Sequence, residues 1–200
     1  MRRSAEQTRG RILEAAYKLF RRQGYNRVTM DNIAEAAKLT KRTLYHHFNS
    51  KDQLLADVLE SQHHLAVQAF RSFGDGLSGS AETIVQAMFQ DLAVWADRPR
   101  WAGSGFTRLV IELADLPGHP ARLIARRHKA KLEKCFGELL AQSGVGRPNK
   151  LARAVWLLSE GAVSLILVHG DRGYSAAASE AAITLVRHHL KNNGPELLPV

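Results

Sequence analysis

Apolar residues recur every three to four positions along most of this chain, and no stretch alternates apolar and polar residues as a half-buried strand does. This period predicts amphipathic helices. Glycines, prolines and capping residues separate the periodic stretches and predict where each helix begins and ends. We therefore predict an all-α fold of about nine helices. The expected helices end at Gly24, begin at Thr29 and Thr40, run from Ser50 to about Phe73, and cover 81–97, 101–115, Pro120 to Gly144, Pro148 to about Asp171, and 176–192.

Three short helices followed by a longer one are predicted for residues 1–55. Thr29 and Thr40 can cap the second and third helices, and Leu39 lies at a tight corner between them. Two short helices joined in this way form a helix-turn-helix, whose second helix can enter the DNA major groove. Leu44 and Phe48 of that helix are expected in the core. The side chains expected on its outer face are Lys41, Arg42, Thr43, Tyr45 and His46.

Positive charge is concentrated in the same segment. Residues 1–55 hold 12 of the 28 Lys and Arg residues but only 5 of the 19 Asp and Glu residues, a net charge of +7 out of +9. A basic segment of this kind favours a polyanionic partner, either nucleic acid or an anionic membrane surface. A membrane-binding segment would need one long amphipathic basic helix, whereas several short helices are predicted here, so nucleic acid is favoured.

Residues Arg9 to Leu55 resemble the DNA-binding domain of the TetR (tetracycline-repressor-like) family. The matching residues, at matching spacing, are Ile12-Leu13, Ala15-Ala16, Leu19-Phe20, Gly24-Tyr25, Val28-Thr29-Met30, Ile33-Ala34, Ala37, Leu39-Thr40, Thr43 to Phe48, and Lys51. Lys38 is a departure, because the family usually has glycine at this turn.

The resemblance implies a role in DNA binding for nine residues. Thr29, Tyr45 and Lys51 match phosphate-binding positions, and Thr40 to Thr43 form the groove-facing start of the recognition helix. A packing role is the alternative for Tyr45 and His47. Arg2, Arg3 and Arg9 form either a solvated tail or an arm that contacts the DNA backbone. The full predicted set is Thr29, Thr40, Lys41, Arg42, Thr43, Tyr45, His46, His47 and Lys51.

Residues 56–200 form the second predicted domain, in which the resemblance implies a ligand-binding and dimerisation region. The helix expected after Pro148 is apolar on more than one side, so it must be covered on more than one side. A homodimer would cover it, and a monomer with a very apolar central helix is the alternative. The predicted dimer residues are Leu151, Ala154, Val155, Leu158, Ala162, Leu165, Ala178, Ala182, Leu185 and Val186.

A small-molecule pocket is expected in the second domain, although ordinary core is the favoured interpretation of each wall residue taken singly. The candidates are Phe89, Trp95, Trp101, Phe106, Leu109 and Trp156 for the walls, and Glu112, His128, Cys135 and His169 as polar groups. Basic residues between Arg122 and Lys134 are either a solvated face or a site for an anionic ligand.

Other classes of protein are disfavoured. No nucleophile, Walker or metalloprotease motif is found, so we expect no enzyme, no catalytic residue, no cofactor and no metal. The Gly74-x-Gly76-x-x-Gly79 match follows a helix, not a strand, and is interpreted as a linker. A single cysteine and no recognisable signal peptide or membrane span favour the cytoplasm.

We expect a sequence-specific transcriptional regulator, more readily a repressor, that binds a palindromic DNA operator as a homodimer and responds to a small molecule. An architectural DNA-binding protein without sequence preference or ligand is the alternative. A helical enzyme is a third possibility that no motif supports.

Overall fold

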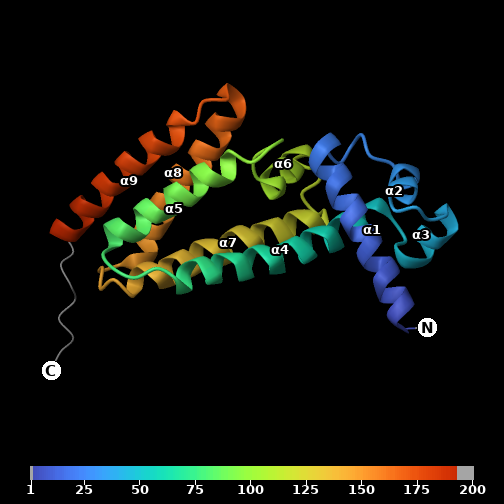
Figure 1. Ribbon diagram of the computed structural model, residues 1–200, viewed down its shortest axis with the longest axis horizontal. Coiled ribbons are helices and arrows are strands. Elements are labelled where there is room, and N and C mark those ends of the chain that lie inside the picture. The colour runs from blue at the N-terminus through green and yellow to red at the C-terminus, as the bar shows by residue number, and fades with distance from the viewer. Residues whose placement is uncertain (1, 193–200) are drawn as a thin grey trace. The chain divides into compact units, whose positions relative to one another are not determined.

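The structure is a computed structural model that describes residues 2–192, and this part of the chain contains helices and no strand (Figure 1). The all-α fold and the number of helices predicted from the sequence are confirmed for these residues. In chain order the helices are α1 (Arg2–Gln23), α2 (Met30–Ala36), α3 (Lys41–His47), α4 (Lys51–Asp75), α5 (Ala81–Ala96), α6 (Gly105–Glu112), α7 (Pro120–Ala141), α8 (Pro148–His169) and α9 (Gly173–Asn192).

Most helix boundaries lie at or near the capping residues and glycines that predicted them. Thr29 and Thr40 cap α2 and α3 through their side-chain oxygens. Gly24, the predicted end of the first helix, follows α1 with φ of +84°, in the left-handed region that favours glycine. Helix α8 ends at His169, slightly before the predicted Asp171, and Gly170 follows it with φ of +71°. The predicted stop of the last helix before Gly194 lies outside the described residues, as do the side chains of Arg2 and Arg3.

Helix α6 is shorter than predicted, covering Gly105–Glu112 instead of 101–115. Arg100 and Gly103 have φ of +58° and +72°, which no right-handed helix can contain. Ser104 then caps the helix by accepting from the Thr107 amide. Periodicity alone did not reveal this interruption, because Trp101 continues the apolar pattern through it.

The chain divides into two compact units. We call residues 1–66 and 104–128 the N-terminal unit, and residues 67–103 and 129–200 the C-terminal unit. Helices α4 and α7 each contribute residues to both. The compact unit that holds the helix-turn-helix thus includes α6 and the start of α7, whereas the functional division between residues 55 and 56 stays a prediction.

The N-terminal unit has its own hydrophobic core. Ile12 and Phe20 of α1, Ile33 of α2, and Leu44 and Phe48 at α3 are buried together. Each such side chain contributes roughly 1.5–3 kcal/mol by leaving water. The same core includes α6 and α7 residues, so a segment far along the sequence completes it: Phe106, Leu109, Leu113, Ala121 and Ala125.

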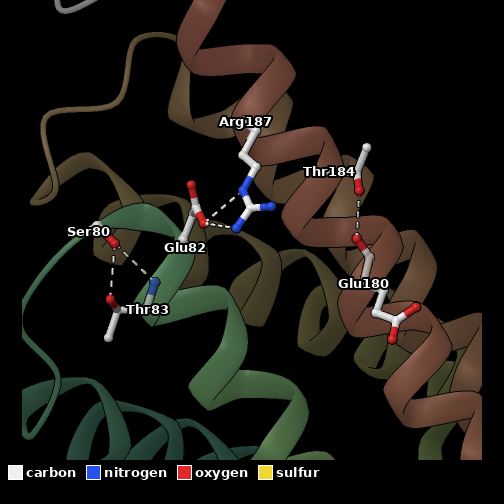
Figure 2. A network of polar contacts seen from close by, with 6 residues as sticks. All are labelled: Ser80, Glu82, Thr83, Glu180, Thr184 and Arg187. Atoms are coloured by element: carbon white, nitrogen blue, oxygen red, sulfur yellow. Dashed lines mark hydrogen bonds and ion pairs between the residues drawn. The ribbon is translucent and has the colours of Figure 1, made fainter.

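Helices α5, α8 and α9 lie side by side in the C-terminal unit (Figure 1). A buried hydrogen bond from the Ser175 hydroxyl to the Phe89 carbonyl, 3.0 Å long, joins α9 to α5. Figure 2 shows a second connection, in which Nε and Nη2 of Arg187 both donate to one oxygen of Glu82, at 3.0 and 2.9 Å. This pair is exposed and contributes little to stability, so apolar packing and the Ser175 bond hold the two helices together.

Helix α8 is the one described helix that is long and apolar enough to cross a membrane by length and composition, with mean hydropathy 1.7 over its most apolar 18 residues. A core helix can meet the same criterion. Leu151, Val155 and Ile166 of α8 are buried in the C-terminal unit, which explains part of this apolar character.

Candidate nucleic-acid interface

The corner between α2 and α3 is built by backbone hydrogen bonds. The amides of Lys38 and Leu39 donate to the carbonyls of Glu35 and Ala34, each at 2.9 Å, which is the Schellman arrangement that ends a helix. Lys38 has φ of +54°, so a lysine occupies the left-handed position that usually takes glycine. The resembled family usually has glycine at this position, and the positive φ of Lys38 shows the backbone reason.

We expect Lys38→Gly to stabilise the protein by about 0.5–1 kcal/mol, because glycine has no Cβ atom to clash in the left-handed conformation. The greater conformational entropy of glycine in the unfolded chain offsets only part of this gain. Lys38→Ala is the control, since it removes the same charge but keeps the Cβ atom. Urea unfolding measures both variants. A Lys38→Gly protein no more stable than Lys38→Ala would show that the turn carries no strain.

Helix α3 presents a polar and basic face to solvent. Thr40 accepts from the Thr43 amide at 3.1 Å, and the two hydroxyl oxygens lie 2.8 Å apart, so both threonines belong to the cap of α3. Arg42, Tyr45 and His46 are exposed. Among the described residues no side chain forms an ion pair or hydrogen bond with Arg42, which leaves its guanidinium available for a ligand.

Lys41 is held by an acidic residue of the neighbouring helix. Its Nζ donates to Oδ2 of Asp31 in α2 at 3.0 Å, and this hydrogen bond raises the lysine pKa. Both side chains are well exposed, so the pair is weak and a phosphate oxygen can compete for the ammonium group. Thr29, at the start of α2, accepts from the Asn32 amide and its own amide donates to the Asn32 side chain, which fixes the Thr29 side chain at the surface.

The buried side of α3 anchors the helix. Leu44 and Phe48 are fully buried, as predicted, which turns the positions between them outward. Arg9 of α1 lies over the Phe48 ring at 4.5 Å and pairs with Asp57 at 2.9 Å. Arg9 therefore belongs to a helix and packs on the core, and the predicted alternative of a solvated tail is wrong for this residue.

His46 and His47 have different surroundings although they are adjacent. His46 is exposed, whereas His47 is half-buried, and their rings lie 5.6 Å apart. Partial burial lowers the pKa of His47, with His46 and Arg9 adding to the effect. His47 is therefore neutral at pH 7, which leaves both its predicted DNA contact and its packing role compatible with its position.

Lys51, predicted to bind phosphate, has two partners inside the protein. Its Nζ donates to the carbonyls of Tyr25 and Val28, both at 3.1 Å, and lies 4.1 Å from the Tyr25 ring centre. An ammonium group has three donors, so one remains for a phosphate. Lys51 thus fixes the loop between α1 and α2 as well as standing at the start of α4.

Two residues near Lys51 were not singled out from the sequence. Asp52 accepts from the Tyr25 hydroxyl, and burial together with this hydrogen bond raises the tyrosine pKa. His119, directly before α7, lies with Nε2 3.6 Å from the other Asp52 oxygen. The His119-Pro120 pair at a helix start is a signal for an N-cap residue, but no sequence pattern indicates a partner 67 positions away.

The predicted pocket residues separate into two groups. Phe106, Leu109, Glu112 and His128 belong to the N-terminal unit, and the other six to the C-terminal unit. The rings of Phe106 and His128 are stacked with their centres 3.6 Å apart, and Glu112 accepts a hydrogen bond from the Asn26 amide at 3.1 Å. These side chains therefore stabilise the local structure.

In the C-terminal unit Trp95 packs edge-on against Trp101, with ring centres 5.3 Å apart, and Trp156 packs against Phe136. Phe89 and Cys135 are buried, whereas His169 is exposed. The indole nitrogens of Trp101 and Trp156 are buried without a hydrogen-bond partner among the described residues. Within each unit the structure joins some predicted pocket residues in pairs, and the pocket itself stays a prediction.

The basic residues of α7 mostly have partners within their own units. Arg122 donates to the Ala114 carbonyl at 2.9 Å, Arg127 pairs with Glu60, and Lys129 pairs with Glu160 at 2.5 Å. These contacts favour the solvated-face interpretation over an anionic ligand. Within residues 2–192 no group of three or more His, Cys, Asp and Glu side chains is arranged to hold a metal ion.

The predicted dimer residues also divide. The structure buries Leu151, Val155, Ala162, Ala182 and Val186 in the core of the C-terminal unit, where the chain's own helices cover them. Ala154, Leu158 and Ala178 are half-buried, and Leu165 and Leu185 are each 40% exposed. Only Leu165 and Leu185 of the predicted set therefore lie on an open face. Hydrophobic periodicity could not separate them from the others, because it does not distinguish a residue in the helix's own core from one on a partner surface.

The described residues thus form an all-helical protein with a capped N-terminal helix-turn-helix and a helical second unit. Residues 12–58 match the family model described as bacterial regulatory proteins, tetR family. The N-terminal part of the chain is therefore similar to the DNA-binding segment of the TetR family. The all-helical fold and its helix-turn-helix were predicted from periodicity and capping residues, and both are confirmed in the described part of the chain.

Curated relatives are similar to part of this chain. The HTH-type transcriptional regulator SrpR of Pseudomonas putida is 40% identical over 84 residues, which cover 42% of this chain and 39% of SrpR. TtgR, another HTH-type transcriptional regulator of Pseudomonas putida, is 42% identical over 59 residues, or 30% of this chain and 28% of TtgR. These curated relatives are thus matched over less than half of their length.

A solved structure extends the likeness to nearly the whole chain. A TetR-family transcriptional regulator from Streptomyces coelicolor has a TM-score of 0.76 and 27% identity, covering 94% of this chain and 96% of its own. The relatives are named as transcriptional regulators and not as enzymes.

Proposed function

We propose that this protein is a sequence-specific DNA-binding transcriptional regulator of the cytoplasm, acting as a repressor. The observation that carries the proposal is the outer face of α3. Arg42 is exposed, without an internal partner among the described residues, near the N-terminus of a helix whose opposite side is locked into the core by Leu44 and Phe48. A helix held in this way can place Arg42 against base edges in the major groove.

Phosphate contacts would come from residues around α3. Thr29, Thr40 and Tyr45 expose hydroxyl groups, and Lys41 and Lys51 supply ammonium groups at the starts of α3 and α4. Such contacts position a protein on DNA and make its affinity fall steeply with salt, whereas base contacts give the specificity. Thr43, His46 and His47 complete the proposed interface.

Selection from a random duplex library tests the proposal directly. A regulator enriches one sequence, and footprinting on that sequence gives a bounded protected region. Enrichment of no sequence, with binding that depends on salt alone, would instead support the alternative of an architectural DNA-binding protein. Reporter expression with and without the protein then distinguishes repression from activation.

A homodimer is the proposed assembly, because an apolar face of the C-terminal unit stays uncovered. Leu157, Leu165 and Val168 of α8 are 73%, 40% and 72% exposed, and Gly161 lies among them at helical spacing. On α9 the exposed residues at similar spacing are Ala177, Ala181 and Leu185. We call these seven residues the α8–α9 face. A second copy would cover it and place two recognition helices on a palindromic operator, with half-sites about one helical turn apart.

Small-molecule control is also proposed, through a shift between states with different operator affinity. The buried, unpartnered indole nitrogens of Trp101 and Trp156 support a ligand in the C-terminal unit, since a ligand acceptor would satisfy them. Thermal shift against a metabolite panel, followed by operator release with each hit, tests this part. A panel without any stabilising compound would favour a regulator that is not a sensor.

Operator affinity should rise as pH falls from 8 towards 6, by up to about tenfold per pH unit for one proton taken up. His47 has a lowered pKa in the free protein and is neutral at pH 7. Neighbouring phosphates would raise that pKa, so binding takes up a proton and acid favours the complex. The dissociation constant at constant ionic strength measures the slope. His47→Gln should flatten it, and an unchanged slope in that variant would exclude His47 from the interface.

A further inference from the structure

A cluster of three polar side chains lies behind the helix-turn-helix, entirely within the N-terminal unit. The Tyr25 hydroxyl donates to Oδ1 of Asp52, and the imidazole of His119 faces Oδ2 of the same carboxylate. Tyr25 belongs to the loop between α1 and α2, Asp52 to the first turn of α4, and His119 to the residue before α7. One carboxylate therefore connects three segments that are far apart in the sequence.

The hydrogen bonds of His119 define which nitrogen carries its proton. Nδ1 accepts from the Ala121 amide at 3.1 Å, so the side chain caps the start of α7. An accepting Nδ1 is unprotonated, and the neutral ring then carries its hydrogen on Nε2. Nε2 is buried and without a hydrogen-bond partner among the described residues, with Oδ2 of Asp52 3.6 Å away.

This separation makes the contact adjustable. A nitrogen–oxygen distance of 3.6 Å is too long for a hydrogen bond, and a buried donor without an acceptor is unfavourable. A small approach of the start of α7 towards the start of α4 would form a hydrogen bond to a carboxylate. The arrangements with and without this hydrogen bond differ by one interaction between His119 and Asp52. Such a difference allows a ligand that favours one arrangement to shift the population towards it.

The cluster is directly connected to the proposed phosphate-binding lysine. Lys51 precedes Asp52 in the same helical turn, and its Nζ is bound to the Tyr25 carbonyl and lies over the Tyr25 ring. Tyr25 is thus held at its hydroxyl by Asp52 and at its backbone by Lys51. A shift of Asp52 acts on Lys51 through both the α4 backbone and Tyr25.

We propose that His119 is a positioning residue, whose Nε2–H closes onto Asp52 when the protein binds DNA and thereby fixes Lys51 for its phosphate contact. This inference rests on the proposed function, because the phosphate role of Lys51 is part of it. Helix α7 continues from His119 as one helix into residues of the C-terminal unit. A change that moves α7 would therefore alter the His119–Asp52 contact and the operator affinity with it.

The test uses the full-length protein and the duplex that wild type enriches from a random library. His119→Asn is the main variant, because asparagine can still cap α7 but is too short to reach Asp52. We expect its dissociation constant to rise about 5- to 10-fold while the melting temperature stays within about 2 °C. Asp52→Asn, which keeps an acceptor for Tyr25 but loses the charge, should give a similar rise.

Double variants identify the route. In a Lys51→Met background, His119→Asn should add no further loss, because the residue through which it acts is already absent. Ser80→Ala is the matched control, since it removes the N-cap of α5 in the C-terminal unit and should leave operator affinity unchanged. Wild-type affinity in His119→Asn, a fully additive loss with Lys51→Met, or a loss that only parallels a fall in melting temperature would overturn the proposal. A wild-type protein that enriches no duplex would instead refute the proposed function, an outcome visible before any variant is measured.

Discussion

Arg42→Ala should weaken binding to the selected operator by about 10- to 100-fold and relax the base preference at one position of each half-site. Arg42 is exposed on α3 and is not engaged within the described part of the chain, so its loss leaves the fold intact. A guanidinium that pairs with guanine contributes mainly to the preferred sequence and little to other sequences. The measurement is fluorescence anisotropy on the operator and on its single-base variants.

Lys51→Ala is the contrasting variant. It should weaken every duplex by a similar factor and reduce the slope of affinity against salt, because a phosphate contact carries no sequence information. It also removes the hydrogen bonds to the Tyr25 and Val28 carbonyls, so a modest loss of stability should accompany it. Arg71→Ala, on an exposed part of α4, controls for charge alone. Equal effects of Arg42→Ala on all sequences would place Arg42 outside the base-contacting surface.

Leu165→Glu should convert the protein from a dimer to a monomer of 22.2 kDa and lower operator affinity by about 100-fold or more. In a symmetric dimer one substitution introduces two carboxylates into one apolar interface, and neither would have a partner. Operator affinity falls because each half-site would then be bound by an independent subunit. Light scattering at micromolar concentration gives the mass, and anisotropy gives the affinity.

Ile111→Glu is the matched control for that experiment. Ile111 is 68% exposed but lies on α6 in the N-terminal unit, away from the α8–α9 face in sequence. Its substitution should change neither the mass nor the affinity. A wild-type protein that is already monomeric, or a Leu165→Glu protein that remains dimeric, would exclude the α8–α9 face as the interface.

The local signals in the sequence predicted most of the helix-turn-helix. Thr29 and Thr40 were recognisable as caps, and Leu44 and Phe48 as core, because capping and periodicity depend on neighbours within one turn or two. Helix α6 was predicted too long, since the left-handed backbone at Arg100 and Gly103 is not visible in an apolar pattern.

The sequence did not predict which residues contact one another across the fold. Val155 and Leu165 lie on one apolar helix, yet only the structure shows that the first is covered by its own chain and the second is open. Lys51 was assigned to phosphate, but its bonds to two loop carbonyls depend on a turn more than 20 residues earlier. The same applies to Asp52 and His119, whose contact joins segments that no short motif spans.

The discontinuous core of the N-terminal unit has a consequence for synthesis on the ribosome. Ile12, Phe20 and Leu44 are made early, whereas Phe106 and Ala121, which pack in the same core, are made much later. A nascent chain that has just completed its helix-turn-helix therefore exposes apolar surface until α6 and the start of α7 emerge. The newly made helix-turn-helix should depend on chaperones during this interval. We expect it to acquire its capacity to bind DNA only when more than half of the chain has been translated.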